Sequence, residues 1–520
     1  MSPLCFVMLY LLKNIISPIE ETPDFRLLIY YKFGIHQNKI SSYTILKRSI
    51  DARKKNHLQY VFTLLVDTSK PLKKHQDIFE YKPTEQSITP STILTNPNPF
   101  IIGMGPAGLF AALKLVENGF KPYLFDQGDS IEKRQEKVKK FWVTKELDPL
   151  SNVQFGEGGA GAFSDGKLTA RSRNIYTEQV FEYLIKFGAK SDIMIDALPH
   201  IGTDDLIIII QEIKIYLIES GCRFFYNHKL ENIEIKNNKI TSVKINNQIY
   251  SPEIVILAIG NSARETFKLL HAKAIALESK AYAIGLRIEH PLDFINKIFY
   301  GEKNDFNITG PATYKLISKH NNRSIYSFCM CPGGYVIPAH SELDGQIVNG
   351  MSYSGRDNAF SNSALVVNIN HDEFGNDVFN GMDFQKQIER DLFDNFIAPA
   401  QNVNDFIANK KGLTKQLKSN SYFFETKTVN FHEQLPNFIC KSLSSALSEF
   451  DYKYKGFASN GLFLGIETRT SSPVRILRDS DKLCSTNISN LYPIGEGSGY
   501  AGGIISSASD GVKIGDMFTI

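Results

Sequence analysis

The sequence predicts an α/β protein with a Rossmann-type nucleotide-binding fold, and three features of the chain support this. Residues 100–102 are apolar and lead directly into the glycine-rich stretch 103–108. A helical pattern follows, and then a second apolar run that ends in Asp126. Residues 254–259 form an unbroken apolar run, which is typical of a parallel strand buried on both faces. These features describe a β-α-β unit whose sheet gains further strands later in the chain.

The composition is that of a globular protein with several domains. Because 520 residues exceed what one hydrophobic core usually serves, we expect about two or three domains. The net charge of +3 is too small to imply a polyanion partner, and six cysteines are too few for a disulfide scaffold. Residues 4–12 are apolar but lack a basic flank and are too short to span a bilayer. We expect a cytoplasmic protein without a membrane span, with a poor signal peptide as the alternative.

Five segments are expected along the chain. They are a small N-terminal α/β module of ferredoxin-like type (1–85), a proline-punctuated linker (86–99), the first part of the nucleotide-binding domain (100–272), an inserted α+β substrate domain (273–451) and the second part of the nucleotide-binding domain (452–520). Within the module, strands are expected at 5–16, 43–49 and 58–66, with a helix from Phe25 to Phe33.

A three-stranded antiparallel meander is expected just before the apolar run at 254–259. Residues 230–235, 240–245 and 248–250 have strand character. Paired asparagines at 237–238 and 246–247 separate them, and asparagine tolerates the positive φ that tight turns require.

The stretch 103–108 has the spacing GxGxxG, and each glycine has a physical role. Gly103 permits a tight turn, Gly105 leaves room for a pyrophosphate, and Gly108 lets the helix pack close to the strand. The helix that begins at Pro106 and Ala107 offers unpaired N–H groups to the phosphates. Asp126 follows Gly108 at the distance where an acid accepts hydrogen bonds from ribose hydroxyls. This spacing alone does not separate NAD from FAD.

Two further features favour FAD. The meander that leads into a buried strand resembles the crossover of the glutathione-reductase-like flavoproteins. Gly495 and Glu496, followed by Gly502-Gly503-Ile504 at the start of a helix, resemble their second flavin motif. A simple NAD-dependent dehydrogenase needs no such return of the chain.

Longer motifs make the resemblance specific. They are NVQFGEGGAGAFSDGKL at 152–168, CMCPGG at 329–334, ETRTSSPVR at 467–475 and GEGSGYAGGI at 495–504. With these motifs the chain resembles, nearly end to end, the FAD-dependent dehydrogenases known as NAD(FAD)-utilising dehydrogenases. The resemblance implies FAD binding and a redox role without a known substrate. One departure is Asn261, which stands where a histidine is expected.

The resemblance and the glycine motifs together define an expected cofactor-binding set. Its members are Gly103, Gly105, Pro106, Ala107, Gly108, Asp126, Gln127, Arg134, Gln154, Gly158, Gly159, Ala160, Gly260, Gly495, Glu496, Gly502, Gly503 and Ile504.

Four residues are candidates for catalysis. The glycine-rich loop at 156–166 is expected to lie against the flavin and is called the flavin loop. Lys167 follows it and could stabilise negative charge on a reduced flavin. Cys329 and Cys331 could relay electrons as a strained, easily reduced disulfide, or could be two buried thiols. Arg287 lies on one strand face with Glu289 and could bind an anionic substrate, or the two could form a structural ion pair.

Other residues carry weaker hypotheses. His200 and His290 are the histidines whose surroundings suggest chemistry. Arg469 and Arg475 bracket a hydroxyl cluster and could hold a carboxylate or phosphate. Metal ligation is not expected, because the cysteines lack a second Cys or His pair at zinc spacing.

The predicted function is an FAD-dependent oxidoreductase that acts on a small molecule, with the flavin reduced by NADH, NADPH or a protein donor. A flavin-dependent RNA-modifying enzyme is one alternative, because residues 1–90 carry 13 basic and 8 acidic side chains. A nucleic-acid partner is nevertheless not expected, since a basic solvated face explains the same charge. A structural or sensory FAD is the other alternative. The sequence does not indicate an oligomeric state.

Overall fold

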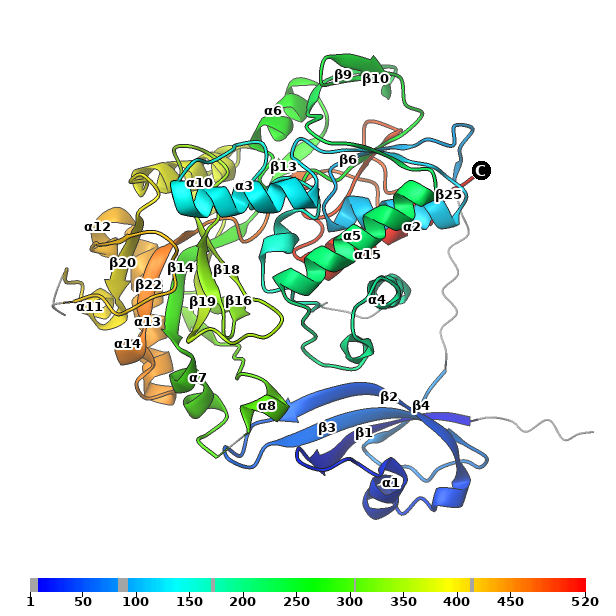
Figure 1. Cartoon of the computed structure of the whole chain (residues 1–520), viewed down its shortest axis with the longest axis vertical. Coiled ribbons are helices and arrows are strands. Elements are labelled where there is room, and N and C mark those ends of the chain that lie inside the picture. The colour runs from blue at the N-terminus through cyan, green and yellow to red at the C-terminus, as the bar shows by residue number, and fades with distance from the viewer. Residues whose placement is uncertain (1–7, 83–91, 170–173, 304, 412–415) are drawn as a thin grey trace, which may run out of the picture. The chain divides into compact units, whose positions relative to one another are not determined.

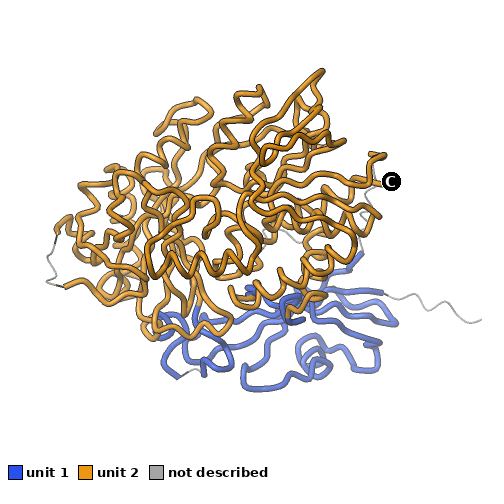
Figure 2. The backbone as a smooth tube through the Cα atoms, turned by 45° about the horizontal axis from the view of Figure 1, so that its top comes forward, with its two compact units in different colours: residues 1–87, 190–200, 295–312 blue, residues 88–189, 201–294, 313–520 orange. Residues whose placement is uncertain are grey.

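The computed structural model describes residues 8–82, 92–169, 174–303, 305–411 and 416–520. They form two compact units, shown in different colours in Figure 2. The first comprises Met1–Ser87, Lys190–His200 and Ile295–Ala312, and the second comprises Ile88–Ala189, Ile201–Phe294 and Thr313–Ile520. The first unit therefore contains two short segments from far along the chain in addition to the predicted N-terminal module.

The first unit is built on a four-stranded antiparallel sheet with the order β2-β3-β1-β4 (Figure 1). The elements are β1 Met8–Pro18, α1 Phe25–Phe33, β2 Ile40–Asp51, β3 Gln59–Thr68 and β4 Ile78–Glu80. Phe25 and Ile29 of α1 pack into one buried cluster with Leu12, Phe62 and Leu64 of the sheet. The strand order matches a ferredoxin-like module, but residues 69–77 between β3 and β4 contain no helix, so the second helix of that motif is missing. The start of the expected strand at 5–16 lies outside the described residues.

The second unit contains a five-stranded, fully parallel sheet with the order β24-β12-β6-β7-β8. Its strands are β6 Phe100–Ile102, β7 Tyr123–Phe125, β8 Arg223–Phe225, β12 Val255–Leu257 and β24 Leu491–Pro493. β6 is the central strand and leads into α2 Pro106–Glu117, as the predicted β-α-β unit requires. The C-terminal segment supplies β24, so the expected return of the chain to this sheet is confirmed.

Helices from distant parts of the sequence lie beside this sheet. They are α3 Ile131–Thr144, α4 Ile175–Lys186, α5 Thr203–Glu219 and α15 Ile504–Gly515. Figure 1 shows α2, α5 and α15 side by side, and α15 contacts both α2 and α4. α15 and α2 approach closely at Gly511, where an added Cβ would lie 2.1 Å from the carbonyl oxygen of Ala107.

The predicted meander is present as a separate three-stranded antiparallel sheet. β9 Leu230–Lys236, β10 Lys239–Ile245 and β11 Gln248–Tyr250 pair in the order β11-β10-β9. All four asparagines of the two turns have positive φ, between 46° and 63°. Apolar residues of the meander, such as Ile233 and Val243, share one buried cluster with Phe100 and Val255 of the parallel sheet.

A seven-stranded sheet forms the rest of the second unit, with the order β15-β16-β19-β14-β22-β20-β21. Its strands are β14 Tyr282–Pro291, β15 Ile317–His320, β16 Arg323–Cys331, β19 Phe360–Ile369, β20 Ala398–Asn402, β21 Thr426–Thr428 and β22 Leu462–Glu467. Only β20 and β21 are parallel; the other neighbours are antiparallel. β22 lies beyond the domain boundary expected at residue 451, so that boundary is placed too early.

The predicted linker is partly structured. Residues 83–91 lie outside the described residues, but β5 Thr92–Ile93 pairs in parallel with β25 Phe518–Thr519 near the C-terminus. Just after it, the carboxylate of Glu253 accepts hydrogen bonds from the backbone of Thr95 and Asn96. Residues 92–96 are therefore part of the second unit and do not act as a spacer.

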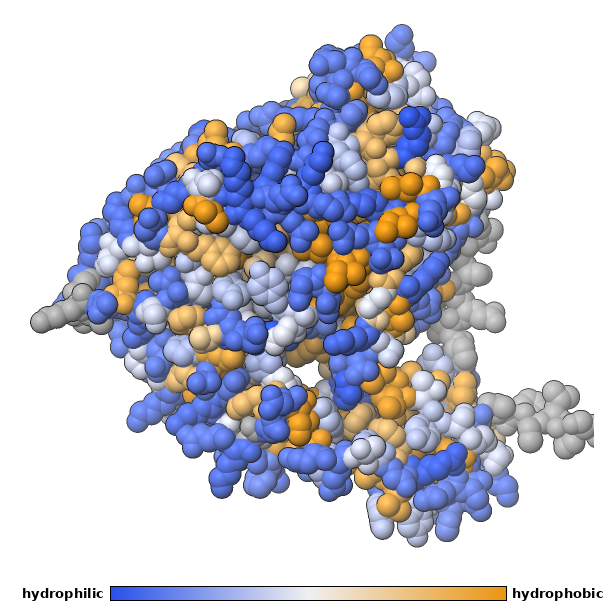
Figure 3. Space-filling view, viewed as in Figure 1, coloured by the Kyte–Doolittle hydropathy of each residue, from blue (hydrophilic) through white to orange (hydrophobic). Residues whose placement is uncertain are grey.

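Further helices are α6 Arg264–Ala272, α7 Leu292–Phe299, α10 Asn380–Asp391, α11 Val403–Ile407 and α13 Asn437–Lys453. α6 contacts β9 of the meander, whereas α11 contacts β20 and α13 contacts β15, β16 and β19 of the seven-stranded sheet. Within the described residues, every helix falls short of the length and apolar character that a membrane span requires. Polar side chains cover most of the face seen in Figure 3, with apolar side chains scattered among them.

We expect Gly511→Ala to destabilise the protein. Alanine has a higher helix propensity than glycine by about 1 kcal/mol, but its Cβ would overlap the Ala107 carbonyl, and overpacking costs about 1–3 kcal/mol. Thermal unfolding followed by circular dichroism would measure the loss as a lower midpoint. Ser509→Ala, in the same helix, is the matched control and should leave the midpoint nearly unchanged. An unchanged midpoint for Gly511→Ala would mean that α2 and α15 are not in this close contact.

Candidate functional site

Three glycine-rich segments meet at the carboxyl end of β6. They are the turn at 103–108, the loop at 156–161 and the start of α15. A Cβ added to Gly159 would lie 3.0 Å from the Cα of Gly105, and one added to Gly161 would lie 3.0 Å from Cγ1 of Ile504. The first two segments therefore approach each other through bare backbone, and Gly161 leaves room for the Ile504 side chain at the start of α15.

The turn after β6 has the conformation expected of a dinucleotide-binding turn. Gly103 has φ 105°, and a Cβ there would lie 2.2 Å from the carbonyl oxygen of Ala258. A Cβ on Gly108 would lie 2.0 Å from the carbonyl oxygen of Gly103. Both glycines therefore perform the packing roles predicted for them.

A second group of glycines borders open space instead of packed backbone. A Cβ added to Gly260, Gly502 or Gly503 would meet no atom within 4 Å. Gly105 and Gly503 are the N-caps of α2 and α15, and neither residue has a side chain to cap its helix. The first N–H groups of both helices lack intrahelical partners and carry partial positive charge. A space lined by glycine backbone and two helix N-termini suits a diphosphate.

Asp126 lies at the end of β7 and holds the turn in place. Its Oδ2 accepts a hydrogen bond from the Met104 N–H at 2.8 Å, and its Oδ1 accepts one from the Gly128 N–H at 2.8 Å. Burial raises the pKa of this carboxyl, although these hydrogen bonds oppose the shift. Contact with a ribose hydroxyl stays a prediction, since each oxygen retains further acceptor capacity.

Arg134 of α3 organises the flavin loop and is fully buried. The cofactor contact predicted for Arg134 is not favoured, because its guanidinium is already surrounded by backbone oxygens. It donates hydrogen bonds to the carbonyls of Asn152, Val153, Gly156, Glu157 and Gly159. Burial lowers the pKa of Arg134 to about 10, so it stays charged at neutral pH.

Glu157 fastens the same loop to its surroundings. Its Oε2 accepts a hydrogen bond from the Ile131 N–H at the start of α3, and its Oε1 accepts one from the Tyr226 hydroxyl. Lys214 lies 3.3 Å from Oε2. The motif at 152–168 included Glu157, but no local pattern revealed that it would cap a helix beginning 26 residues earlier.

The C-terminal flavin motif is joined to the first half of the site by side-chain hydrogen bonds. Asn261 donates to Oε1 of Glu496 at 2.7 Å, and Ser262 donates to Oε1 of Gln154 at 3.2 Å. Burial raises the pKa of Glu496 to about 7, which the hydrogen bond from Asn261 opposes. Asn261, the departure from the family pattern, therefore contacts a predicted cofactor residue directly.

The remaining cofactor candidates fall in the same region. Ala160 begins the 3-10 helix η2 Ala160–Phe163, and Gly158 donates its N–H to the Met104 carbonyl at 2.8 Å. Gly495 donates its N–H to Asp510, which also pairs with Arg478. Arg478 and Asp510 are contributions that the sequence analysis missed, because nothing in the local pattern links residues 32 positions apart. Gln127 is partly exposed between Asp126 and Gly128.

Arg287 is not placed to bind a substrate, which corrects the prediction. Its side chain is completely buried, and it forms an ion pair with Glu467. Its Nε donates to Oδ1 of Asn362 at 2.7 Å, and its Nη2 donates to the Cys329 carbonyl. A Cβ on Gly350 would lie 2.0 Å from Nη2, so Gly350 makes room for this guanidinium.

Glu289 and His290 are also structural. Glu289 is buried, and its carboxylate accepts hydrogen bonds from the backbone and hydroxyl of Ser421. His290 is buried against Phe457, whose carbonyl it contacts at 2.8 Å. Burial lowers the pKa of His290 to about 4, so the ring is neutral at neutral pH. His200 belongs to the first unit.

Lys167 lies at the end of the flavin loop and is partly exposed. Its Nζ is 3.4 Å from Oδ2 of Asp165, which also receives a hydrogen bond from Arg356 at 2.7 Å. The Ser352 hydroxyl bonds to the other oxygen of Asp165. A hydrogen bond from Cys331 lowers the pKa of Cys329, and the charge of Lys167 adds to this effect. The predicted catalytic cysteines lie near Ser352, because a Cβ added to Gly334 would lie 3.1 Å from the Cβ atoms of both Cys331 and Ser352.

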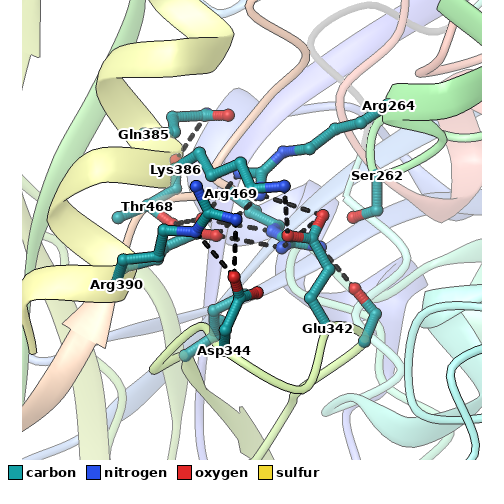
Figure 4. A network of polar contacts seen from close by, with 12 residues as sticks. Ser262, Arg264, Glu342, Asp344, Gln385, Lys386, Arg390, Thr468 and Arg469 are labelled. Atoms are coloured by element: carbon teal, nitrogen blue, oxygen red, sulfur yellow. Dashed lines mark hydrogen bonds and ion pairs between the residues drawn. The ribbon is translucent and has the colours of Figure 1, made fainter. Parts of the chain in front are cut away.

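Arg469 is held in a buried ionic network, which corrects its predicted role as an anion clamp (Figure 4). Glu389 of α10 is fully buried and accepts hydrogen bonds from Arg469, Arg264 and Thr468. Glu342 also lies 3.1 Å from Arg264. Arg475 likewise pairs with Glu278, at 2.7 Å. Glu389 was not predicted, because it lies in a helix without a recognisable motif.

Within the described residues, no group of three or more His, Cys, Asp and Glu side chains is arranged to hold a metal ion.

We expect Glu389→Gln to destabilise the protein by about 3–5 kcal/mol, because it leaves two buried arginines without their shared anion. Burial opposes ionisation of Glu389, but the charges of Arg469 and Arg264 outweigh it and lower the pKa to about 2. The stabilisation is therefore complete above the usual value of 4.5 and is lost as the pH falls towards 2.

Thermal midpoints of wild type and Glu389→Gln, measured from pH 7 to pH 3, would test this. The difference between the two thermal midpoints should be constant at neutral pH and should become smaller below pH 4.5. Asp391→Asn, in the same helix and with an exposed side chain, is the control. A gap that does not change with pH would contradict the ion pairing.

Comparison with known proteins identifies two recognised domains in this chain. Residues 281–470 match the family described as FAD-dependent protein, C-terminal domain-like. Residues 11–67 match a domain of unknown function, DUF8436. The seven-stranded sheet, including β22, thus corresponds to a recognised domain of FAD-dependent proteins.

Similar solved structures include CtdE in complex with FAD, at 10% identity over 81% of this chain and 83% of that chain with a TM-score of 0.31. They also include PqsL, a probable FAD-dependent monooxygenase from Pseudomonas aeruginosa, at 12% identity over 81% and 85% with a TM-score of 0.35. Similarities this low support no transfer of a reaction or substrate.

An uncharacterized protein from Clostridium beijerinckii is 41% identical over 497 residues, which cover 93% of each chain. The chain belongs to the same family as this Clostridium beijerinckii protein, and FAD is its cofactor.

Proposed function

We propose that this protein is an FAD-dependent oxidoreductase in which a Rossmann-type domain, of the glutathione-reductase-like kind, holds the cofactor. The observation that carries the proposal is the junction of β6 and α2 with the start of α15. There, glycine backbone and two helix N-termini border open space at the carboxyl end of a parallel sheet. Ligands of such sheets bind at this end.

Several groups would hold FAD in this arrangement. The N-termini of α2 and α15, with Gly105 and Gly503, would face the diphosphate and the adjoining chain of the cofactor. Asp126 would meet the ribose, and Glu496 with Asn261 would meet the polar region between the diphosphate and the ring. The loop 156–161, held rigid by Arg134 and Glu157, would lie against the flavin. FAD, when bound, supplies the capacity to accept and release two electrons.

The substrate would lie between the flavin loop and the seven-stranded sheet. Lys167 provides a positive charge at the end of the loop, on an Nζ that is buried beside Asp165. Glu496 has a pKa raised to about 7, so its carboxyl can exchange a proton near neutral pH. A cation and a proton carrier beside a flavin suit a dehydrogenase or reductase that acts on a small molecule.

The electron donor is proposed to be NADH or NADPH, or a protein. Among the described residues, the other wholly parallel sheet is the two-stranded pair of β5 and β25, which is too small to form a separate dinucleotide domain. A nicotinamide donor would therefore have to approach the flavin transiently.

The structure offers no specific support for the RNA-modifying alternative. Among the cations of the N-terminal module, Arg48 pairs with Asp192 and Asp196, and Arg53 pairs with Asp51. These internal pairs reduce the charge that is free for phosphates.

We expect Gly105→Val to abolish FAD binding. A Cβ on Gly105 already lies 3.7 Å from the Cα of Gly159, and the larger side chain would fill the space proposed for the diphosphate. The visible absorption spectrum of the purified variant, compared with that of wild type, reports the loss of flavin. Gly355→Val, at an exposed glycine without positive φ, should keep the yellow colour. A fully yellow Gly105→Val protein would refute the assignment of this site.

We expect NADH or NADPH, added without oxygen, to bleach the visible absorption of the FAD-loaded protein. Stopped-flow spectroscopy would measure the rate with each nucleotide, and photoreduction of the same sample would show that the flavin can be reduced. Flavin that photoreduces but responds to neither nucleotide would exclude NAD(P)H and leave a protein donor. Flavin that no donor reduces would favour a structural or sensory cofactor.

A further inference from the structure

Cys329 and Cys331 lie at a β-bulge at the end of β16. The register between β16 and β19 shifts between Phe328 and Cys331, so the strand bulges at the two cysteines. Cys329 has φ 44°, a left-handed conformation that costs about 1 kcal/mol or more for a residue with a Cβ. Bulges of this kind re-aim a side chain. Here the bulge falls at the two cysteines and interrupts the regular alternation of side chains along the strand.

The bulge is held by Arg287. Its guanidinium donates to the Cys329 carbonyl at 2.5 Å and to Sγ of Cys331 at 3.4 Å. Asn362 and Glu467 bind the other side of the guanidinium. A buried cation is thus kept in contact with the Cys331 thiol and the Cys329 backbone, in a place where a positive charge favours a thiolate.

The two cysteines have different surroundings. Cys331 is buried, and its Sγ contacts the Cys329 carbonyl at 3.3 Å, whereas Cys329 keeps part of its surface exposed. A hydrogen bond from Cys331 lowers the pKa of Cys329 against the effect of burial, and the charges of Lys167 and Arg287 add to the effect. Burial raises the pKa of Cys331. One thiolate and one thiol is the arrangement that a dithiol needs for oxidation to a disulfide.

The pair also lies next to the flavin site. A Cβ added to Gly334 would lie 3.1 Å from the Cβ atoms of both Cys331 and Ser352. The Ser352 hydroxyl bonds to Asp165, two residues before Lys167 at the end of the flavin loop. Ser352 therefore connects the neighbourhood of the cysteines to the loop that is proposed to contact the flavin.

We infer that Cys329 and Cys331 form a dithiol–disulfide couple that exchanges two electrons with the bound FAD, with Arg287 as the positioning residue. The inference rests on the proposed function, because it requires bound FAD. In the oxidising direction, the Cys329 thiolate forms a bond to the Cys331 sulfur as the S–H bond of Cys331 breaks. The two sulfurs lose two electrons and one proton, and the oxidised flavin gains both and becomes the reduced anion. The reverse step regenerates the thiols.

The first experiment detects the disulfide without using activity. Holoprotein is oxidised with diamide, desalted, denatured in iodoacetamide and digested with trypsin. Both cysteines lie in one peptide, residues 324–356. We expect the mass of this peptide to be that of the unalkylated dithiol form minus two hydrogens, because a disulfide does not react with iodoacetamide. The peptides with the buried Cys222 and Cys440 should carry carbamidomethyl groups. A doubly alkylated peptide after oxidation would overturn the inference.

The second experiment counts electrons. Oxidised wild type and Cys331→Ser, each with bound FAD, are titrated with dithionite without oxygen while the flavin absorption is followed. We expect wild type to consume twice as much dithionite per flavin as Cys331→Ser, because its disulfide takes up a second electron pair. Cys484→Ser, at a partly exposed thiol, is the control and should behave as wild type.

The outcomes separate this inference from the proposed function. Wild-type protein that takes up no FAD would refute the proposed function. Protein that binds FAD but consumes equal dithionite with and without Cys331 would refute the dithiol couple alone. If Cys331→Ser does not fold, the comparison is made between wild type oxidised with diamide and wild type reduced with dithiothreitol, where the same twofold difference is expected.

Discussion

The structure of the candidate cofactor site depends on close approaches at residues that carry no side chain. An added Cβ would lie within 2.0–3.0 Å of the Ala258 carbonyl at Gly103, of the Gly103 carbonyl at Gly108, of the Gly105 Cα at Gly159 and of the Ile504 side chain at Gly161. Because these segments approach closely, the N-termini of α2 and α15 lie near the same space. Both helix ends would then stabilise one anion, the proposed diphosphate. A methyl group at these contacts would separate the segments and remove the basis of the site.

The close contact leaves the loop 152–166 without regular hydrogen bonding, and buried side chains compensate for this. Arg134 binds five of its carbonyl oxygens, and Glu157 ties it to the start of α3 and to Tyr226. Burying a charged side chain costs free energy unless the side chain is hydrogen-bonded. The hydrogen bonds of Arg134 and Glu157 offset this cost and hold the loop in one conformation. The Glu389 network performs a similar task between α10 and the segment after β22.

The sequence was sufficient for features that local rules determine. The β-α-β unit, the asparagine turns of the meander and the helix at Ile504 follow from glycine, asparagine and apolar spacing, and all are present. The sequence was insufficient where side chains act over long separations. Arg287 and Arg469 looked like substrate clamps because their buried partners, Glu467 and Glu389, cannot be recognised from spacing. The boundary at 451 failed because β22 pairs with strands that precede it by more than 60 residues.

The position of residues 491–520 in the fold limits the order in which the parts of the candidate site can assemble. β24 is an outer strand of the parallel sheet, α15 covers α2, and β25 pairs with β5 ahead of the whole domain. During synthesis, the amino-terminal half of the flavin site emerges long before these pieces exist. The pocket can therefore close only after β24 and α15 have been synthesised, and the amino-terminal half alone lacks one of the two helix ends that border it.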